Sequence, residues 1–219
     1  DKPMKKTLYS LMLSDEVVAE VDRLAHKYGT NRSNLINQIL AERVGLVTPE
    51  RRINDILAQI EQLLLPSRDI VPFFAPNAMT MSMKSSLEYK YRPTVKYEVE
   101  LFRGNEEALG EITVNFRTQS AALLGSMAEF FRLWKSIEDV HLRPLLGANA
   151  PRYALCEGRF VRSIAVPEGD CSSEELAKVI SEYIKLFDTM MKGYLAGRFD
   201  AREVEACYFS LMRKSRVLI

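Results

Sequence analysis

The sequence predicts an α+β protein. Apolar residues alternate with polar ones in short stretches within residues 89–117, as in half-buried strands, and recur every three or four residues over 120–142, as in a helix. The composition agrees, because a chain of 219 residues with 47% hydrophobic and 27% charged residues can bury a core and is not broadly disordered. The net charge is only +1, so any site for a polyanion must be local.

The first 48 residues contain one strand pattern followed by two helix patterns. Over residues 5–13 the apolar side chains alternate, which predicts a strand. Ser14 is a suitable N-cap for a helix over 15–28 that Gly29 ends. Asn31 can cap a second helix that runs to Val44, and Gly45 closes it.

This short unit is physically incomplete as a single copy. A lone strand leaves its backbone hydrogen-bonding groups without partners, and about 45 residues bury only a marginal core. Antiparallel pairing of the strands of two chains would supply the missing hydrogen bonds and let four helices cover one face of the two-stranded ribbon. We therefore expect an obligate homodimer.

Three local features carry a resemblance to a known family. They are the step Leu13-Ser14-Asp15-Glu16-Val17, the helix end at Tyr28-Gly29 and the helix start Asn31-Arg32-Ser33-Asn34-Leu35-Ile36. In these features the stretch Lys5–Leu46, about a fifth of the chain, resembles the ribbon-helix-helix fold of the Arc/MetJ-type bacterial regulators.

The resemblance implies that the ribbon lies in the DNA major groove and that the start of the second helix holds the DNA backbone. Tyr9, Leu11 and Leu13 would then face the helices, and the alternate residues would face the groove. Ser10 would bond a base edge, and Leu8 would cover a thymine methyl group. The DNA-binding residues implied in this way are Lys5, Lys6, Leu8, Ser10, Met12, Asn31, Arg32 and Ser33.

The groove face departs from the family pattern. Leu8 and Met12 are apolar where the family usually has Arg, Lys, Thr, Gln or Asn, so Ser10 is the only central residue that can read a base by hydrogen bonding. A ribbon with apolar residues on both faces is also consistent with a second interpretation. In that alternative the unit only dimerises the chain, and the protein is a protein-interaction module that binds no DNA.

Residues 49–86 contain an amphipathic helix and a connection. The spacing of apolar residues over Glu50–Leu65 predicts the helix, which either packs on the next domain or pairs with its copy in the dimer. Pro66–Ser86 contains three prolines, and we expect an irregular, partly packed connection there.

We expect residues 87–219 to form a larger α+β domain, in the order ββα, strands, αα. Tyr89–Phe102 and Gly110–Arg117 predict an antiparallel hairpin with one wet face, and the helix over Ser120–Leu142 buries Trp134. Capping boxes starting at Ser172 and Asp200 predict the two final helices. Between the helix over 120–142 and these two final helices, the pattern of residues 153–166 predicts extended chain with a break at Gly158.

Nothing in the sequence indicates catalysis, a metal or a cofactor. His26 and His141 each stand alone, and no nucleotide-binding loop or hydrolase motif occurs. Cys156, Cys171 and Cys207 have no ligand-like spacing, and we expect the first and last of them in the core. We expect no catalytic or metal site and no enzyme activity.

The combined prediction is a cytoplasmic, sequence-specific DNA-binding transcriptional regulator, a repressor or a plasmid-maintenance factor. Residues 1–48 would dimerise and bind DNA, 49–86 would link, and 87–219 would sense a small-molecule or protein effector or join dimers into higher oligomers. The expected partners are double-stranded DNA and a second copy of the chain. We expect no membrane association, because no run of 18 apolar residues occurs.

Overall fold

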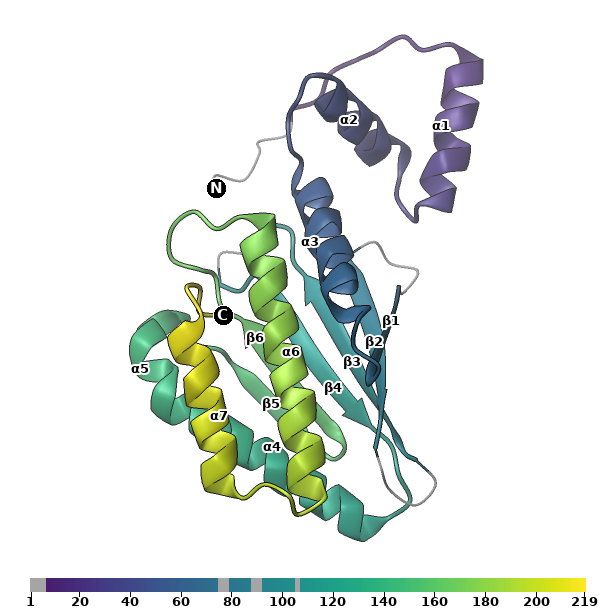
Figure 1. Ribbon diagram of the computed structural model, residues 1–219. Coiled ribbons are helices and arrows are strands. Elements are labelled where there is room, and N and C mark those ends of the chain that lie inside the picture. Colours follow the sequence, from purple (N-terminus) through teal and green to yellow (C-terminus); the bar gives the residue numbers. More distant parts are fainter. Residues whose placement is uncertain (1–6, 75–78, 88–91, 105–106) are drawn as a thin grey trace.

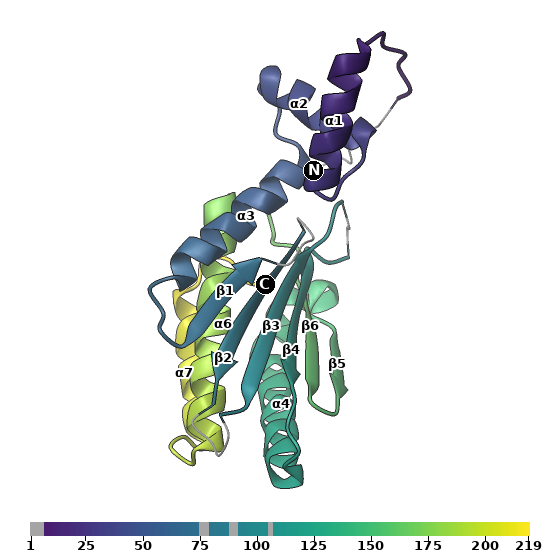
Figure 2. The same cartoon turned by 90° about the vertical axis from the view of Figure 1, so that its right-hand side faces the viewer.

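The computed structural model describes residues 7–74, 79–87, 92–104 and 107–219, with backbone only for 72–74. Within these residues, six strands form one antiparallel sheet in the order β1-β2-β3-β4-β6-β5 (Figures 1 and 2). The strands are β1 (Ile70–Phe74), β2 (Thr80–Ser86), β3 (Thr94–Leu101), β4 (Gly110–Phe116), β5 (Tyr153–Cys156) and β6 (Arg159–Ile164).

The helices lie against one face of this sheet, apart from the first two, which extend beyond its end (Figures 1 and 2). They are α1 (Asp15–Lys27), α2 (Arg32–Arg43), α3 (Pro49–Leu64), α4 (Ala121–His141), α5 (Arg143–Leu146), α6 (Ser173–Leu195) and α7 (Ala201–Lys214). A 3-10 turn, Gly147–Asn149, directly follows α5. The result is a two-layer α+β unit that carries a small helical unit at one end. The predicted fold class is confirmed at this level.

Alternation along β3 shows that the sheet has a core face and a wet face. In β3, Val95, Tyr97 and Val99 are buried, while their neighbours Lys96 and Glu98 are only partly buried and pair with each other at 2.9 Å. Register places Glu98 opposite Thr113 on β4, so the polar side chains of neighbouring strands share one face. Among the described helices none covers that face, which explains its charged composition.

One aromatic-rich core holds the layers together. Trp134 on α4 is fully buried, as predicted, and packs edge-on against Phe187 of α6 and Tyr208 of α7. The apolar stripe of α3, which includes Ile56, Leu57 and Ile60, belongs to the same core. Of the two roles considered for this helix, the single chain shows packing on the larger unit, mainly against α6.

The N-terminal helices follow the sequence prediction closely. The Ser14 hydroxyl accepts from Val17 N at 3.4 Å, and the Asn31 side chain accepts from Asn34 N at 2.9 Å, so both expected N-caps are present. Gly29 has a φ of 63° just past α1, in the left-handed region that glycine adopts without strain.

The strand expected over residues 5–13 is not formed in the single chain. Thr7–Ser14 has no regular secondary structure, and residues 5 and 6 lie outside the described part of the chain. The physical reason is that a strand needs a neighbour to complete its ladder, and the predicted neighbour belongs to a second copy.

The irregular connection expected over Pro66–Ser86 was wrong, because this segment contains β1 and β2. β1 is an edge strand, with a neighbouring strand on one side only. Proline has no backbone N–H group to donate, so a proline such as Pro72 is tolerated in an edge strand. Residues 49–86 are therefore part of the same layered unit as 87–219.

The core position expected for Cys156 was also wrong. Cys156 lies on the edge strand β5 and is exposed, while Cys207 is partly buried.

Candidate nucleic-acid interface and buried polar cluster

The segment before α1 presents its side chains to solvent. Leu8 is 95% exposed and Met12 is 102% exposed, and Ser10 between them is exposed as well. Tyr9, Leu11 and Leu13, which the prediction directs toward the helices, are also exposed in the single chain. Neither set of alternating residues is buried in the single chain, and Lys5 and Lys6 lie outside the described residues.

Exposed apolar side chains are concentrated in the N-terminal unit to an unusual degree. Twelve of the eighteen large hydrophobic residues that are exposed in the described chain fall within residues 8–47, although this stretch is a small part of the protein. On α2 the set includes Ile39 and Leu40, and Val44 follows at its C-terminal end. An exposed apolar surface of this density marks an interaction site.

The core that this unit buries by itself is small. It consists of Val21, Ala25 and Leu35, with Leu24 and Ile36 packed partly against them, and it is separate from the large core. A core of this size stabilises two short helices only marginally. The unit therefore has both too little buried apolar area and too much exposed apolar area for an independent domain.

The start of α2 brings together the three residues expected to hold a phosphate. Asn31, Arg32 and Ser33 are all exposed, and the first backbone N–H groups of the helix point out of its N-terminus. Arg32 is held in place by Asp22 of α1: Nε donates to Oδ1 at 2.7 Å and Nη2 donates to Oδ2 at 2.5 Å.

This exposed ion pair shifts the pKa of both partners in favour of their charged forms. Hydrogen bonding to Arg32 lowers the pKa of the Asp22 carboxyl, and hydrogen bonding to Asp22 raises the pKa of the guanidinium. The pair orients Arg32 but uses only one edge of its guanidinium. Nη1, with two N–H groups, makes no hydrogen bond within the described residues.

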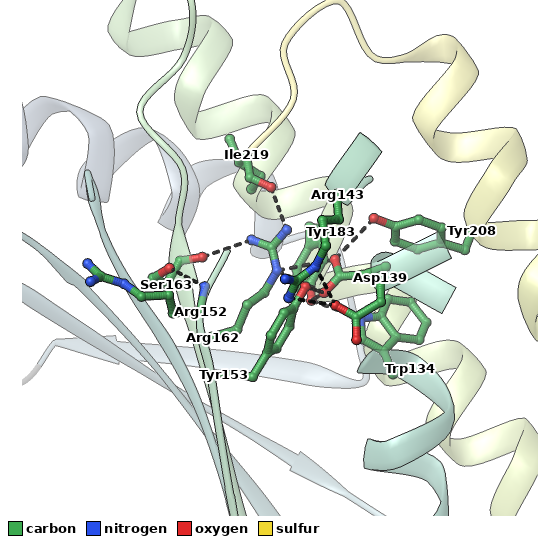
Figure 3. A network of polar contacts seen from close by, with 11 residues as sticks. Trp134, Asp139, Arg143, Arg152, Tyr153, Arg162, Ser163, Tyr183, Tyr208 and Ile219 are labelled. Carbon is green, nitrogen blue, oxygen red and sulfur yellow. Dashed lines mark hydrogen bonds and ion pairs between the residues drawn. The ribbon is translucent and has the colours of Figure 1, made fainter. Parts of the chain in front are cut away.

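A second group of polar residues lies inside the large unit, where five elements meet (Figure 3). Glu138 of α4 and Arg162 of β6 form an ion pair with side-chain exposures of 0% and 1%, and Arg162 Nε lies 3.0 Å from Glu138 Oε2. Three tyrosine hydroxyls also donate to this carboxylate. They are Tyr153 of β5 at 2.7 Å, Tyr208 of α7 at 3.1 Å and Tyr183 of α6 at 3.4 Å.

Burial controls the ionisation of this cluster. Burial first, and the adjacent Glu138 charge second, raise the pKa of Tyr153, Tyr183 and Tyr208. Burial alone would lower the pKa of Arg162, but the attraction of Glu138 outweighs it and raises that pKa above its ordinary value. Arg162 is therefore charged and the phenols are protonated at neutral pH.

Sequence reasoning missed this cluster because its members are far apart in the chain. A local signal was nevertheless present: Glu138 is four residues after Trp134 on the buried stripe of α4, and Arg162 lies between Phe160 and Ile164 on the core face of β6. A charged residue at a position where periodicity requires an apolar one indicates a buried pair.

A hollow of about 260 Å³ lies away from both places, beside β5, β6 and the β3–β4 connection, with Val161 and Ser163 in its wall. Its arginine, Arg152, is 68% exposed and pairs with Glu107. Solvent screens such a pair, so the charges of this hollow add little specificity.

Within the described residues no three His, Cys, Asp or Glu side chains are grouped closely enough to hold a metal ion. No helix there has the length and apolar character needed to cross a bilayer. No family model matches the chain, and no match was found among curated proteins or solved structures.

Proposed function

We propose that this chain is a sequence-specific DNA-binding transcriptional regulator, a cytoplasmic repressor or plasmid-maintenance factor, that acts as a dimer. The observation that carries the proposal is the concentration of exposed apolar side chains around the unpaired segment Thr7–Ser14 and along α2. A second copy would cover both at once.

Dimerisation would convert this extended segment into a two-stranded ribbon. Pairing gives each strand the backbone hydrogen bonds that it lacks in the single chain. Tyr9, Leu11 and Leu13 would then pack on the helices of the dimer, and Ile39 with Leu40 would join the shared core. Burying apolar area stabilises by about 25 cal/mol per Å², so covering these side chains gives a large driving force.

The opposite face of the ribbon would then carry Lys6, Leu8, Ser10 and Met12. A two-stranded ribbon fits the width of the B-DNA major groove, where a serine hydroxyl can bond a base edge and an aliphatic side chain can contact a thymine methyl group. The exposed start of α2, with Asn31, the oriented Arg32 and Ser33, offers N–H donors to a backbone phosphate. Dimers bound side by side would occupy half-sites about 10 bp apart.

The test is selection of DNA fragments by the purified full chain, followed by affinity measurements on the selected sequence at several salt concentrations. Because phosphate contacts release counterions, affinity should fall steeply as salt rises. The double variant Lys6→Ala/Arg32→Ala should bind more weakly and show a slope shallower by about one unit for each phosphate that the variant no longer neutralises. Its dimer should remain intact.

A matched control removes two exposed cations far from the proposed interface. Lys178 on α6 and Arg202 on α7 are exposed, and Lys178→Ala/Arg202→Ala should leave the affinity and the salt slope unchanged. Equal losses in both double variants would show only a general charge effect and would contradict the proposed interface.

Ser10→Ala separates base reading from general binding. It should reduce discrimination at one base pair by about 1–3 kcal/mol while affecting binding to unrelated DNA little.

The apolar character of Leu8 and Met12 favours a second candidate, a dimeric protein-interaction module. A dimer that selects no DNA sequence and shows no salt-dependent DNA binding would support that function in place of the first.

A further inference from the structure

Two charged rows run across the strands on the wet face of the sheet. The strand register sets residues of β2, β3, β4 and β6 directly opposite one another in a basic row of Lys84, Lys96, Asn115 and Arg159. Four residues away along the same strands lies an acidic row of Thr80, Glu100, Glu111 and Ser163. None of the described helices covers either row, so a partner can reach both (Figure 2).

A middle row separates the two charged rows. It consists of Ser82, Glu98, Thr113 and Val161. Glu98, the charged member of this row, already pairs with Lys96 of the basic row at 2.9 Å. Because a strand rises about 3.3 Å per residue, each charged row lies about 7 Å from the middle row, on opposite sides of it. The wet face is therefore positive on one side of its middle and negative on the other.

The charges of both rows are poorly neutralised within the chain. Lys84 lies directly opposite Lys96, although like charges at such positions repel each other. Glu100 and Glu111 face each other in the same way. Neither of these glutamates forms an ion pair within the described residues, and Arg159 forms none there either. A surface with the opposite pattern of charge would remove both repulsions.

A second copy of the same face has this opposite pattern. A half-turn about an axis that runs across the strands, along the middle row, keeps each strand over its counterpart and exchanges the two charged rows. The basic row of one copy then lies over the acidic row of the other. Because the contact is isologous, this complementary pairing occurs twice. Packed sheets keep their strands within about 30° of a common direction, which this arrangement allows.

We propose that the wet face binds the wet face of a second copy and forms a weak second interface, separate from the one at the N-terminal unit. In this contact Lys96 of one copy lies over Glu100 of the other. Arg159 of one copy lies over Ser163 of the other and beside its Glu111. The contact goes beyond the proposed DNA binding and does not depend on it, because it uses no residue of the N-terminal unit.

The hollow beside β5 and β6 provides room for the incoming arginine. Its volume is about 260 Å³, and Glu111, Val161 and Ser163 line it. Water screens the charges around this hollow while it is open. A second sheet excludes that water, so the attraction between Arg159 of one copy and Glu111 of the other becomes stronger.

The size of the wet face limits the strength of the contact. Five strands about 4.8 Å apart, over the roughly 17 Å that the three rows cover, present about 400 Å² on each copy. A stable protein complex buries about 800 Å² on each partner. We therefore expect a dissociation constant of about 0.1 mM or weaker, so the contact is absent from micromolar solutions. Dimers aligned on neighbouring DNA half-sites would reach the necessary effective concentration.

Charge reversal in the full chain tests the contact. Two variants reverse the rows separately: Lys84→Glu/Arg159→Glu and Glu100→Lys/Glu111→Lys. Each variant repels its own copies at both pairings, whereas in a mixture of the two every pairing again joins opposite charges. By sedimentation velocity at low salt, the mass of the unmodified chain should rise between about 10 μM and about 0.5 mM. Neither variant alone should show this rise, and their equimolar mixture should associate at least about ten-fold more tightly than the unmodified chain.

Matched controls make the same changes of charge on exposed positions of the helices. They are Lys178→Glu/Arg202→Glu and Asp55→Lys/Glu129→Lys. Each control should associate as the unmodified chain does, and their mixture should associate no more tightly than that. Unchanged Trp134 fluorescence shows that a variant is folded. Each rise in mass is measured from the state at about 10 μM, so the result does not depend on the N-terminal dimer.

Two results would overturn the proposal. One is an unmodified chain whose mass stays constant up to about 0.5 mM at low salt. The other is a control mixture that associates as tightly as the mixture of the two reversed variants, because general attraction between oppositely charged proteins would then explain the association.

Discussion

Replacing Arg162 by Met tests the energetic role of the buried cluster. The substitution keeps an unbranched apolar side chain on β6 but leaves the Glu138 carboxylate, which is 0% exposed, without its counter-charge. Breaking a buried pair in this way costs about 3–5 kcal/mol. The three tyrosine hydroxyls still donate to Glu138, so we expect the lower end of that range for Arg162→Met and the upper end for Glu138→Leu, which strands the arginine instead.

The double variant Glu138→Leu/Arg162→Met removes both charges together. It leaves all three tyrosine hydroxyls without the carboxylate acceptor. The cost is about 1 kcal/mol for each of the shorter bonds, from Tyr153 and Tyr208, and less for the 3.4 Å bond from Tyr183. We therefore expect a loss of about 2–3 kcal/mol, smaller than that of either single variant, and a coupling energy of at least about 3 kcal/mol.

The assay is urea unfolding followed by the fluorescence of Trp134, the only tryptophan of the chain, which lies in the same cluster. The exposed pair between Arg152 and Glu107 provides a control: Arg152→Met should change the unfolding free energy by less than about 1 kcal/mol. If the double variant loses as much as the sum of the single variants, Glu138 and Arg162 act independently and the reasoning is refuted.

Three further predictions concern stability. Gly110→Ala should destabilise the protein by about 1–3 kcal/mol, because the added Cβ would lie 2.1 Å from Glu100 O. Gly125→Ala on α4, where the added Cβ would meet nothing within 4 Å, should stabilise it by up to about 1 kcal/mol. Thermal unfolding of both variants checks that the two effects have opposite signs. Ser172→Ala should cost about 1 kcal/mol by removing the hydroxyl that caps α6, measured in the same assay. The contribution of the buried tyrosines to stability should be constant up to about pH 10 and fall above it. The fall should be about 1.4 kcal/mol per pH unit for each tyrosine whose raised pKa keeps it protonated only in the folded state. Urea titrations between about pH 9 and 11 measure the slope, and Tyr208→Phe should reduce it by one tyrosine's share. The tyrosines concerned are Tyr97, Tyr153, Tyr183 and Tyr208.

Local signals explain what the sequence predicted well. The caps Ser14, Asn31, Ser172 and Asp200 act within three residues of themselves, so the starts of α1, α2, α6 and α7 were found at the observed positions. The alternation in β3 and β4 and the stripe of α4 also depend only on neighbours in the chain. These elements were sufficient for the α+β class and for the expected burial of Trp134.

The features that were missed depend on distant partners. β1 and β2 lack clear alternation and contain Pro72 and several serines, and their strand state comes from pairing with each other and with β3. The buried cluster draws side chains from α4, β5, β6, α6 and α7, and no spacing within the chain links them. The segment Thr7–Ser14 is the remaining case, because its predicted strand requires a partner outside the chain.

That partner can be tested most directly by sedimentation equilibrium of the full chain and of a variant that lacks residues 1–13. The account predicts a dimer for the full chain and a monomer for the shortened variant, with the Trp134 environment of the larger unit unchanged in both. A full chain that sediments as a monomer, or a shortened variant that remains a dimer, would contradict it.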